Sequence, residues 1–164
     1  MRALCAMNSV TLRKASTDDR EFSYCVKRAA FKQYVEKISD WDEDEQRQLH
    51  DQRFRVQDFR VISLAGTDVG IMAVAVAPDC LKVNQLFLLP EHQGWEIGRW
   101  CMLLLMEEAR QLGLPVRLRV MKVNPRAVAF YERLGFMRTG ETDTHDLMEW
   151  AHNKSLRPTR CTRG

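Results

Sequence analysis

The segment from Leu86 to Leu112 constrains the fold more than any other part of this 164-residue chain. An apolar extended run, Leu86 to Leu88, leads into a polar turn with glycines at positions 94 and 98. The residues that follow recur at the spacing of a helix with one buried face: Ile97, Trp100, Cys101, Leu104, Leu105, Ala109 and Leu112. The first amides of such a helix have no partners within it, and the helix dipole favours negative charge beside them. The sequence therefore predicts a strand, a glycine-containing turn and a helix start that binds an anion.

Neighbouring segments predict a sheet around this unit. The runs Phe59 to Leu64 and Val69 to Val76 are separated by a short polar turn, which is typical of an antiparallel hairpin. Apolar residues fill both phases of Ile71 to Val76, so we expect helices on both faces of the sheet. Gly113 should end the central helix, and Val116 to Val120 predicts the next strand.

Two motifs resemble those of a known family. The residues Gln93 to Gly98 (QGWEIG) lie between an extended run and a helix, and they resemble the acetyl-CoA pyrophosphate loop of the GNAT-type N-acetyltransferase superfamily. The residues Asn124 to Phe136 (NPRAVAFYERLGF) resemble the second motif of that superfamily at the expected separation. Independently of the resemblance, Asn124 and Pro125 are typical of a helix start. The resemblance implies an α/β GNAT fold: a mixed central β-sheet of about seven strands, with a splay between the two central parallel strands, flanked by about four helices.

The resemblance also implies residues that bind acetyl-CoA as a cosubstrate. Backbone of Leu86, Phe87 and Leu88 would pair with the pantetheine arm as an added strand would. The phosphates would bind the turn and the helix start, at Gln93, Gly94, Trp95, Glu96, Ile97, Gly98 and Arg99. Asn124 would contact the pantetheine arm. The hydroxyl of Tyr131 would protonate the leaving thiolate, because a phenol is a reasonable acid toward a thiolate.

The sequence departs from the family pattern at two positions. Glu96 stands where the loop more often has a third glycine, and Arg119 stands where some members carry a glutamate base. A negative charge about 6 Å from a phosphate costs about 0.7 kcal/mol in water and about 3 kcal/mol at an effective dielectric of 20, so we expect weakened cofactor binding. Glu36, or water near Asn84 and Gln85, could replace the base. These departures leave open a catalytically weak acyl-CoA-binding sensor or regulatory module.

An acidic segment from Glu36 to Glu45 contrasts with the basic balance of the whole chain. Ser39 or Asp40 is placed to cap a second helix, and carboxylates in a first helical turn are also the ordinary complement of its dipole. The resemblance places the first two helices beside the acceptor. Glu36 and Trp41 are therefore candidate substrate-binding residues, the carboxylate attracting a cationic amine and the indole offering a cation–π contact.

Length and composition fit one domain, expected at 10–152 between an N-terminal extension (1–9) and a basic tail (153–164). The net charge of +3 is too small to argue for nucleic acid, and no apolar run is long enough to span a membrane. The five cysteines have no metal-ligand spacing, so we expect reduced thiols, no metal and a cytoplasmic protein. Many relatives are dimers, which leaves a homodimer open. The sequence thus predicts an N-acetyltransferase that transfers the acetyl group of acetyl-CoA to a primary amine of a small-molecule or peptide acceptor by direct attack.

Overall fold

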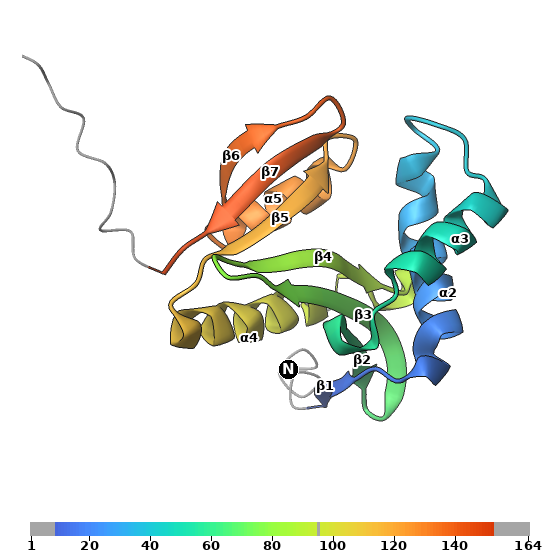
Figure 1. The fold of residues 1–164 in the computed structure, drawn as a ribbon, viewed down its shortest axis with the longest axis horizontal. Helices are drawn as coiled ribbons and strands as arrows, with labels where there is room; N and C mark the ends of the chain where they lie inside the picture. The colour runs from blue at the N-terminus through green and yellow to red at the C-terminus, as the bar shows by residue number, and fades with distance from the viewer. Residues whose placement is uncertain (1–8, 95, 153–164) are drawn as a thin grey trace, which may run out of the picture.

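The computed structural model describes residues 9–94 and 96–152. They form a seven-stranded mixed sheet with the order β1-β2-β3-β4-β5-β7-β6 (Figure 1). The strands are β1 (Val10–Lys14), β2 (Phe59–Leu64), β3 (Thr67–Val76), β4 (Leu81–Leu88), β5 (Val116–Met121), β6 (Met137–Glu141) and β7 (His145–Trp150). The α-helices are α2 (Arg20–Val35), α3 (Glu43–Arg53), α4 (Ile97–Leu112) and α5 (Pro125–Arg133), with single 3-10 turns η1 (Thr17–Asp19), η2 (Val56–Asp58) and η3 (Pro90–His92). The predicted α/β architecture is confirmed. The expected basic tail and nearly all of the N-terminal extension lie outside the described residues.

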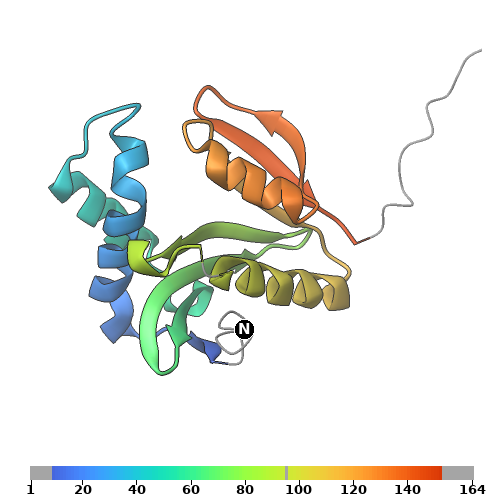
Figure 2. The ribbon, with the colours of Figure 1, turned by 180° about the vertical axis from the view of Figure 1, so that it is seen from behind.

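Helices cover both faces of the sheet, as the apolar residues in both phases of β3 predict. Successive strand residues point to opposite faces. Ile71 and Ala73 pack with Val26 of α2, whereas Met72 and Val74 belong to the larger core that includes α4. Figure 2 shows α4 and α5 on the side of the sheet opposite to that seen in Figure 1.

The two parallel strands in the middle of the sheet stay together for only three residue pairs. β4 pairs with β5 from Leu81 opposite Val116 to Val83 opposite Leu118. Beyond these pairs β4 continues along β3 and β5 continues along β7, so the two strands diverge (Figures 1 and 2). The β3–β4 register shifts at the same point and leaves Asn84 as an extra residue in β4. Such a bulge bends its strand, and here it marks the start of the predicted splay.

Local signals in the sequence position the two helices behind this splay. Gly113 ends α4 in the left-handed conformation, with φ 67°. The side chain of Asn124 caps α5 by accepting a hydrogen bond from the amide of Ala127 at 3.1 Å, and Pro125 follows as the first helical residue. Both predicted helix ends are confirmed.

The start of α3 differs from the prediction. We expected Ser39 or Asp40 as the N-cap, but Asp42 caps the helix and accepts from the amide of Glu45 at 2.8 Å. Several residues of this segment have capping chemistry, so tertiary contact decides between them. The carboxylate of Glu43 accepts from the hydroxyl of Tyr24 at 2.7 Å and thereby fixes the first turn of α3 against α2.

A buried histidine holds the other end of α3 against α2. His50 is 1% exposed, and its Nε2 lies 2.9 Å from Oγ of Ser23 and 3.2 Å from the carbonyl oxygen of Arg20. Its ring also packs near those of Phe54 and Phe59. Burial lowers the pKa of His50, because the charged imidazolium is poorly solvated there.

This histidine should make the protein less stable in mild acid. The unfolded chain takes up a proton on His50 as the pH falls below about 6.5, whereas the folded protein resists protonation, so the free energy of unfolding falls with pH. We expect a decrease between pH 7 and pH 5.5 in urea denaturation. His50→Phe keeps an aromatic ring and leaves Ser23 bonded to the carbonyl of Arg20 at 2.8 Å. This variant should show a shallower decrease; an equally steep one would contradict the assignment.

Candidate functional site

The turn before α4 exposes backbone amides to an anion. The first helical hydrogen bond runs from the amide of Trp100 to the carbonyl oxygen of Glu96 at 3.0 Å. The amides of Ile97, Gly98 and Arg99 therefore precede the helical ladder and have no partner within it. Their position at the positive end of the helix dipole suits a phosphate group. Trp95, which was also predicted to bind here, lies outside the described residues.

Glu96 occupies a conformation that favours glycine. Its φ is 60° and its ψ is 9°, which is left-handed, and the nearby Gly94 has a φ of 81°. A residue with a Cβ loses about 1 kcal/mol or more in this conformation. This explains why a glycine suits the position better. The side chain of Glu96 is exposed, so solvent screens its charge.

Helix α5 contributes a cation, Arg126, that was not among the predicted binding residues. Nη2 of Arg126 lies 4.0 Å from the point where a Cβ on Gly94 would be. A Cβ on Gly98 would lie 3.6 Å from the ring of Phe130 and 3.9 Å from Cδ1 of Leu88. The start of α4 is thus packed between β4 and α5. The position of Arg126 depends on this packing, so the only sequence signal was its place in the second motif, two residues after Asn124.

The splay leaves one edge of β4 without a neighbouring strand. The amide of Leu89 donates to the carbonyl of Val69 at 2.9 Å, and in an antiparallel pair every second residue faces the partner strand. Phe87 therefore directs its backbone groups toward β3, where it lies opposite Ile71. Leu86 and Leu88 direct theirs to the other side, where β5 has already diverged.

One side chain contacts this free edge directly, and another anchors the strand to α2. Nε2 of Gln93 donates to the carbonyl oxygen of Leu88 at 3.0 Å, which ties the turn to the strand. The ring of Phe87 points to the opposite face and lies 5.2 Å from that of Phe31 on α2. Of the three predicted β4 residues, Leu86 and Leu88 thus offer backbone groups to the splay, and Phe87 contacts α2.

Tyr131 lies on α5 and directly follows Phe130, the residue that approaches Gly98 of α4. Its ring packs against those of Phe130 and Phe136, with centroid distances of 5.0 Å and 5.6 Å. Burial raises the pKa of Tyr131, so the hydroxyl keeps its proton at neutral pH. No described residue forms a hydrogen bond with that hydroxyl, which leaves it available to a ligand.

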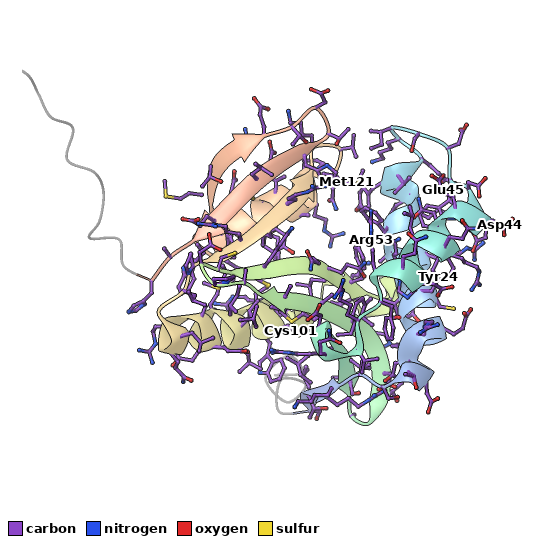
Figure 3. The ribbon with its side chains drawn as sticks, in the orientation of Figure 1. Tyr24, Asp44, Glu45, Arg53, Cys101 and Met121 are labelled. Atoms are coloured by element: carbon purple, nitrogen blue, oxygen red, sulfur yellow. The ribbon has the colours of Figure 1, made fainter. Side chains whose placement is uncertain are left out.

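A pocket of about 620 Å³ lies where β4 leaves β5, on the face of the sheet that carries α2 and α3. We call it the splay pocket. Its wall includes Arg53 and Asp58 near the end of α3, Asn84 and Gln85 at the bulge of β4, and Arg119 on β5. Figure 3 shows Arg53 on the side of α3 that faces the central strands. The pocket therefore reaches the point at which the free edge of β4 begins.

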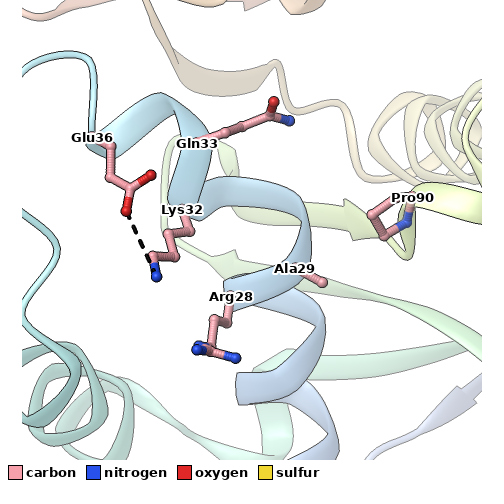
Figure 4. A pocket seen from close by; sticks show the side chains of 6 residues that line it. All are labelled: Arg28, Ala29, Lys32, Gln33, Glu36 and Pro90. Atoms are coloured by element: carbon pink, nitrogen blue, oxygen red, sulfur yellow. Dashed lines mark ion pairs between the residues drawn. The ribbon is translucent and has the colours of Figure 1, made fainter.

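The two residues predicted to bind the acceptor lie elsewhere. Glu36 lines a shallow pocket of about 580 Å³ between α2 and Pro90, where it forms an ion pair with Lys32 at 3.6 Å (Figure 4). Nε1 of Trp41 donates to Oε2 of Glu43 at 2.9 Å. Neither Glu36 nor Trp41 is among the residues that line the splay pocket.

Comparison with known proteins decides the family. The family model described as "Acetyltransferase (GNAT) family" matches residues 24–136, well over half of the chain. The chain belongs to the GNAT acetyltransferase family. This confirms the membership inferred from the two motifs, and it makes the protein an acyltransferase by family. Among proteins of curated function, none matches the sequence significantly.

Solved structures share the GNAT fold at low sequence identity. The PaiA N-acetyltransferase from Thermoplasma acidophilum in complex with coenzyme A has a TM-score of 0.74 at 20% identity, covering 88% of this chain and 99% of that one. The ribosomal-protein-S18-alanine N-acetyltransferase from Escherichia coli has a TM-score of 0.68 at 19% identity, with 90% and 98% covered. Mutant forms of the spermidine/spermine N-acetyltransferase SpeG from Vibrio cholerae give 0.64 at 21% identity, with 88% and 94% covered.

Other reactive groups contribute little to this site. Cys25, Cys80 and Cys101 have free thiols, and burial raises the pKa of Cys101 to about 12, which makes it a poor nucleophile. Residues 9–94 and 96–152 contain no group of three or more histidine, cysteine or acidic side chains that could hold a metal ion. Nor does any helix in these ranges have the length and apolarity needed to cross a membrane.

Replacing Glu96 should separate the two effects of this residue. Glu96→Gly removes both the charge and the left-handed strain, so it should tighten acetyl-CoA binding about threefold and raise the free energy of unfolding by up to about 1 kcal/mol. Glu96→Gln removes the charge alone and should tighten binding without the gain in stability. Calorimetry and urea denaturation measure the two quantities, with the exposed Glu45→Gln as a control. Unchanged or weaker binding in both Glu96 variants would show that this glutamate does not hinder the cofactor.

Proposed function

We infer that the protein transfers the acetyl group of acetyl-CoA to a primary amine by direct attack of the amine on the thioester. One observation carries the proposal: the start of α4, the free edge of β4 and the helix that bears Tyr131 converge. Gly98 lies against both Leu88 and Phe130, the residue before Tyr131. A single extended ligand could therefore contact all three elements.

The residues present fit acetyl-CoA. The amides of Ile97, Gly98 and Arg99 would bind the pyrophosphate, and the guanidinium of Arg126 adds a positive charge beside Gly94. The outward backbone groups of Leu86 and Leu88 would hold the pantetheine arm as an added strand. Gln93 and Glu96 belong to the same turn, Asn124 caps the helix that bears Arg126, and Phe87 of β4 packs against Phe31 of α2. When bound, acetyl-CoA supplies an acetyl group activated as a thioester.

The chain's own groups would perform the remaining steps. A β4 amide that faces the splay, from Leu86 or Leu88, would polarise the thioester carbonyl. The protonated hydroxyl of Tyr131 would deliver its proton to the departing thiolate. The acceptor must lose a proton before it attacks, and Asp58 supplies a carboxylate to the splay pocket. Asp58 is therefore the candidate base in this pocket, since Arg119 replaces the glutamate that some family members use and Glu36 lines a different pocket.

A second function is favoured by a specific observation. Glu96 brings a negative charge to the anion site, where it would oppose the binding of a phosphate, while its left-handed backbone costs folding stability. A catalytically weak acyl-CoA-binding sensor or regulatory module would tolerate weakened binding. One structural neighbour is named for a polyamine acceptor and another for an alanine of a ribosomal protein. The shared fold therefore does not select the acceptor.

Calorimetric titration with acetyl-CoA, followed by thiol release in the presence of amines, tests both functions. Micromolar binding together with acetyl transfer to an amine supports the enzyme. Micromolar binding without transfer to any amine favours the sensor. No binding at millimolar acetyl-CoA would overturn both.

Removing the Tyr131 hydroxyl should impair turnover more than binding. Tyr131→Phe keeps the ring contacts but lacks the acid, so kcat should fall by about 10²-fold while the Kd for acetyl-CoA stays within about twofold. The matched control is Tyr34→Phe, which removes a hydroxyl from α2. Equal losses in kcat and in acetyl-CoA affinity would rule out the acid role.

A further inference from the structure

Positive charge dominates the splay pocket. Its lining carries four cationic side chains, Arg53, Arg55, Lys82 and Arg119, and one carboxylate, Asp58. None of the four cations forms an ion pair with a described residue. Of the eleven described arginines outside the pocket, seven form ion pairs with carboxylates, namely Arg13, Arg28, Arg47, Arg60, Arg110, Arg117 and Arg138.

The four cations come from three parts of the fold. Arg53 ends α3, Arg55 follows it, Lys82 lies on β4 and Arg119 lies across the splay on β5. The dipole at the end of α3 accounts for Arg53, but it does not account for the other three. Lys27 of α2 places another positive charge near Arg53. Its pKa is lowered first by burial and then by the nearby charge of Arg53.

The remaining lining suits the small body and the amine of an acceptor. Ala73, Ala75 and Val83 supply short apolar side chains. Oε1 of Gln85 is buried and has no hydrogen-bond donor among the described residues. An amine N–H could satisfy this oxygen, and Gln85 directly follows the bulge residue Asn84, where the free edge of β4 begins.

We propose that the acceptor is a small amine that also carries a carboxylate, such as an amino acid or a short acidic peptide, and that it binds in the splay pocket. Its amine faces Gln85 and Asp58, and its carboxylate lies among Arg55, Lys82 and Arg119. This inference rests on the proposed acetyl transfer and names the substrate class for it. It reverses the expectation that the acidic segment captures a cationic amine, because Glu43 of that segment is already bonded to Tyr24, Arg28 and Trp41.

Matched amines test the charge preference directly. The first set is 4-aminobutyrate, n-butylamine and putrescine, which share a four-carbon chain and differ in the charge at its far end. The second set is the C-amidated dipeptides Gly-Glu, Gly-Gln and Gly-Lys. Calorimetry measures their binding to the protein with and without saturating coenzyme A. We expect the acidic member to bind at least tenfold more tightly than the neutral one, the cationic member to bind most weakly, and salt to reduce the preference.

Two pocket variants assign the effect to named residues. Lys82→Gln and Arg119→Gln should each weaken binding of the acidic members about fivefold, while the affinities for n-butylamine and acetyl-CoA stay within twofold. The controls make the same changes at exposed residues that form no ion pair with a described residue: Lys14→Gln on β1, at the far edge of the sheet, and Arg133→Gln at the end of α5. These should leave all affinities unchanged.

The outcomes separate this inference from the proposed function. Loss of acetyl-CoA binding would overturn the acetyl transfer, and the titrations without coenzyme A would still decide the charge preference. If acetyl-CoA binds but neither set favours its acidic member, or if putrescine binds most tightly, the assignment of the acceptor is wrong while the acetyl transfer stands. An acidic preference that Lys82→Gln and Arg119→Gln leave intact would also overturn it.

Discussion

The structure depends on how short the hydrogen-bonded stretch between β4 and β5 is. A parallel pair that continued to the ends of both strands would satisfy every backbone group of Leu86 and Leu88 within the sheet. Pairing instead stops at Val83 and Leu118, and the extra residue Asn84 bends β4 at that point. Gln93 satisfies the carbonyl of Leu88, and the other unpaired groups of this edge must be satisfied by water or by a ligand, because buried backbone groups are rarely left without partners. The same divergence opens the splay pocket on one face and sets α4 against α5 on the other.

Charge is distributed over this frame in two different ways. The acidic segment looks in sequence like an amine-binding rim, but its first helical carboxylate, Glu43, holds α3 against α2 through Tyr24 and Arg28. A carboxylate with three donors has little capacity left for a substrate. The cations of the splay pocket have the opposite character, since they converge without carboxylate partners. Free charges that converge on a pocket bear on specificity more directly than charges already engaged in packing.

The sequence predicted what local chemistry determines. Gly113 and the pair Asn124-Pro125 marked helix ends, and the two motifs identified the family and with it the splayed sheet. Prediction from the sequence failed where residues that are distant along the chain meet in the fold. The cap at Asp42 depends on contacts between α2 and α3, and the approach of Arg126 to Gly94 depends on packing between α4 and α5. The basic pocket is invisible for the same reason, because its cations are spread over residues 53–119 and come together only in the fold.

Glu96 combines one feature that the sequence showed with one that only the fold reveals. Its departure from the glycine pattern was visible in sequence, whereas its left-handed backbone became evident only in the structure. The fold keeps the turn because the residues on both sides are fixed: Gln93 is bonded to Leu88, and Gly98 is packed between Leu88 and Phe130. Arg126 places a positive charge near the same turn and partly offsets the carboxylate. A strained residue held by its surroundings at a ligand site is a common feature of functional loops. Glu96 is therefore more consistent with a tuned affinity for acetyl-CoA than with a loop that has lost its role.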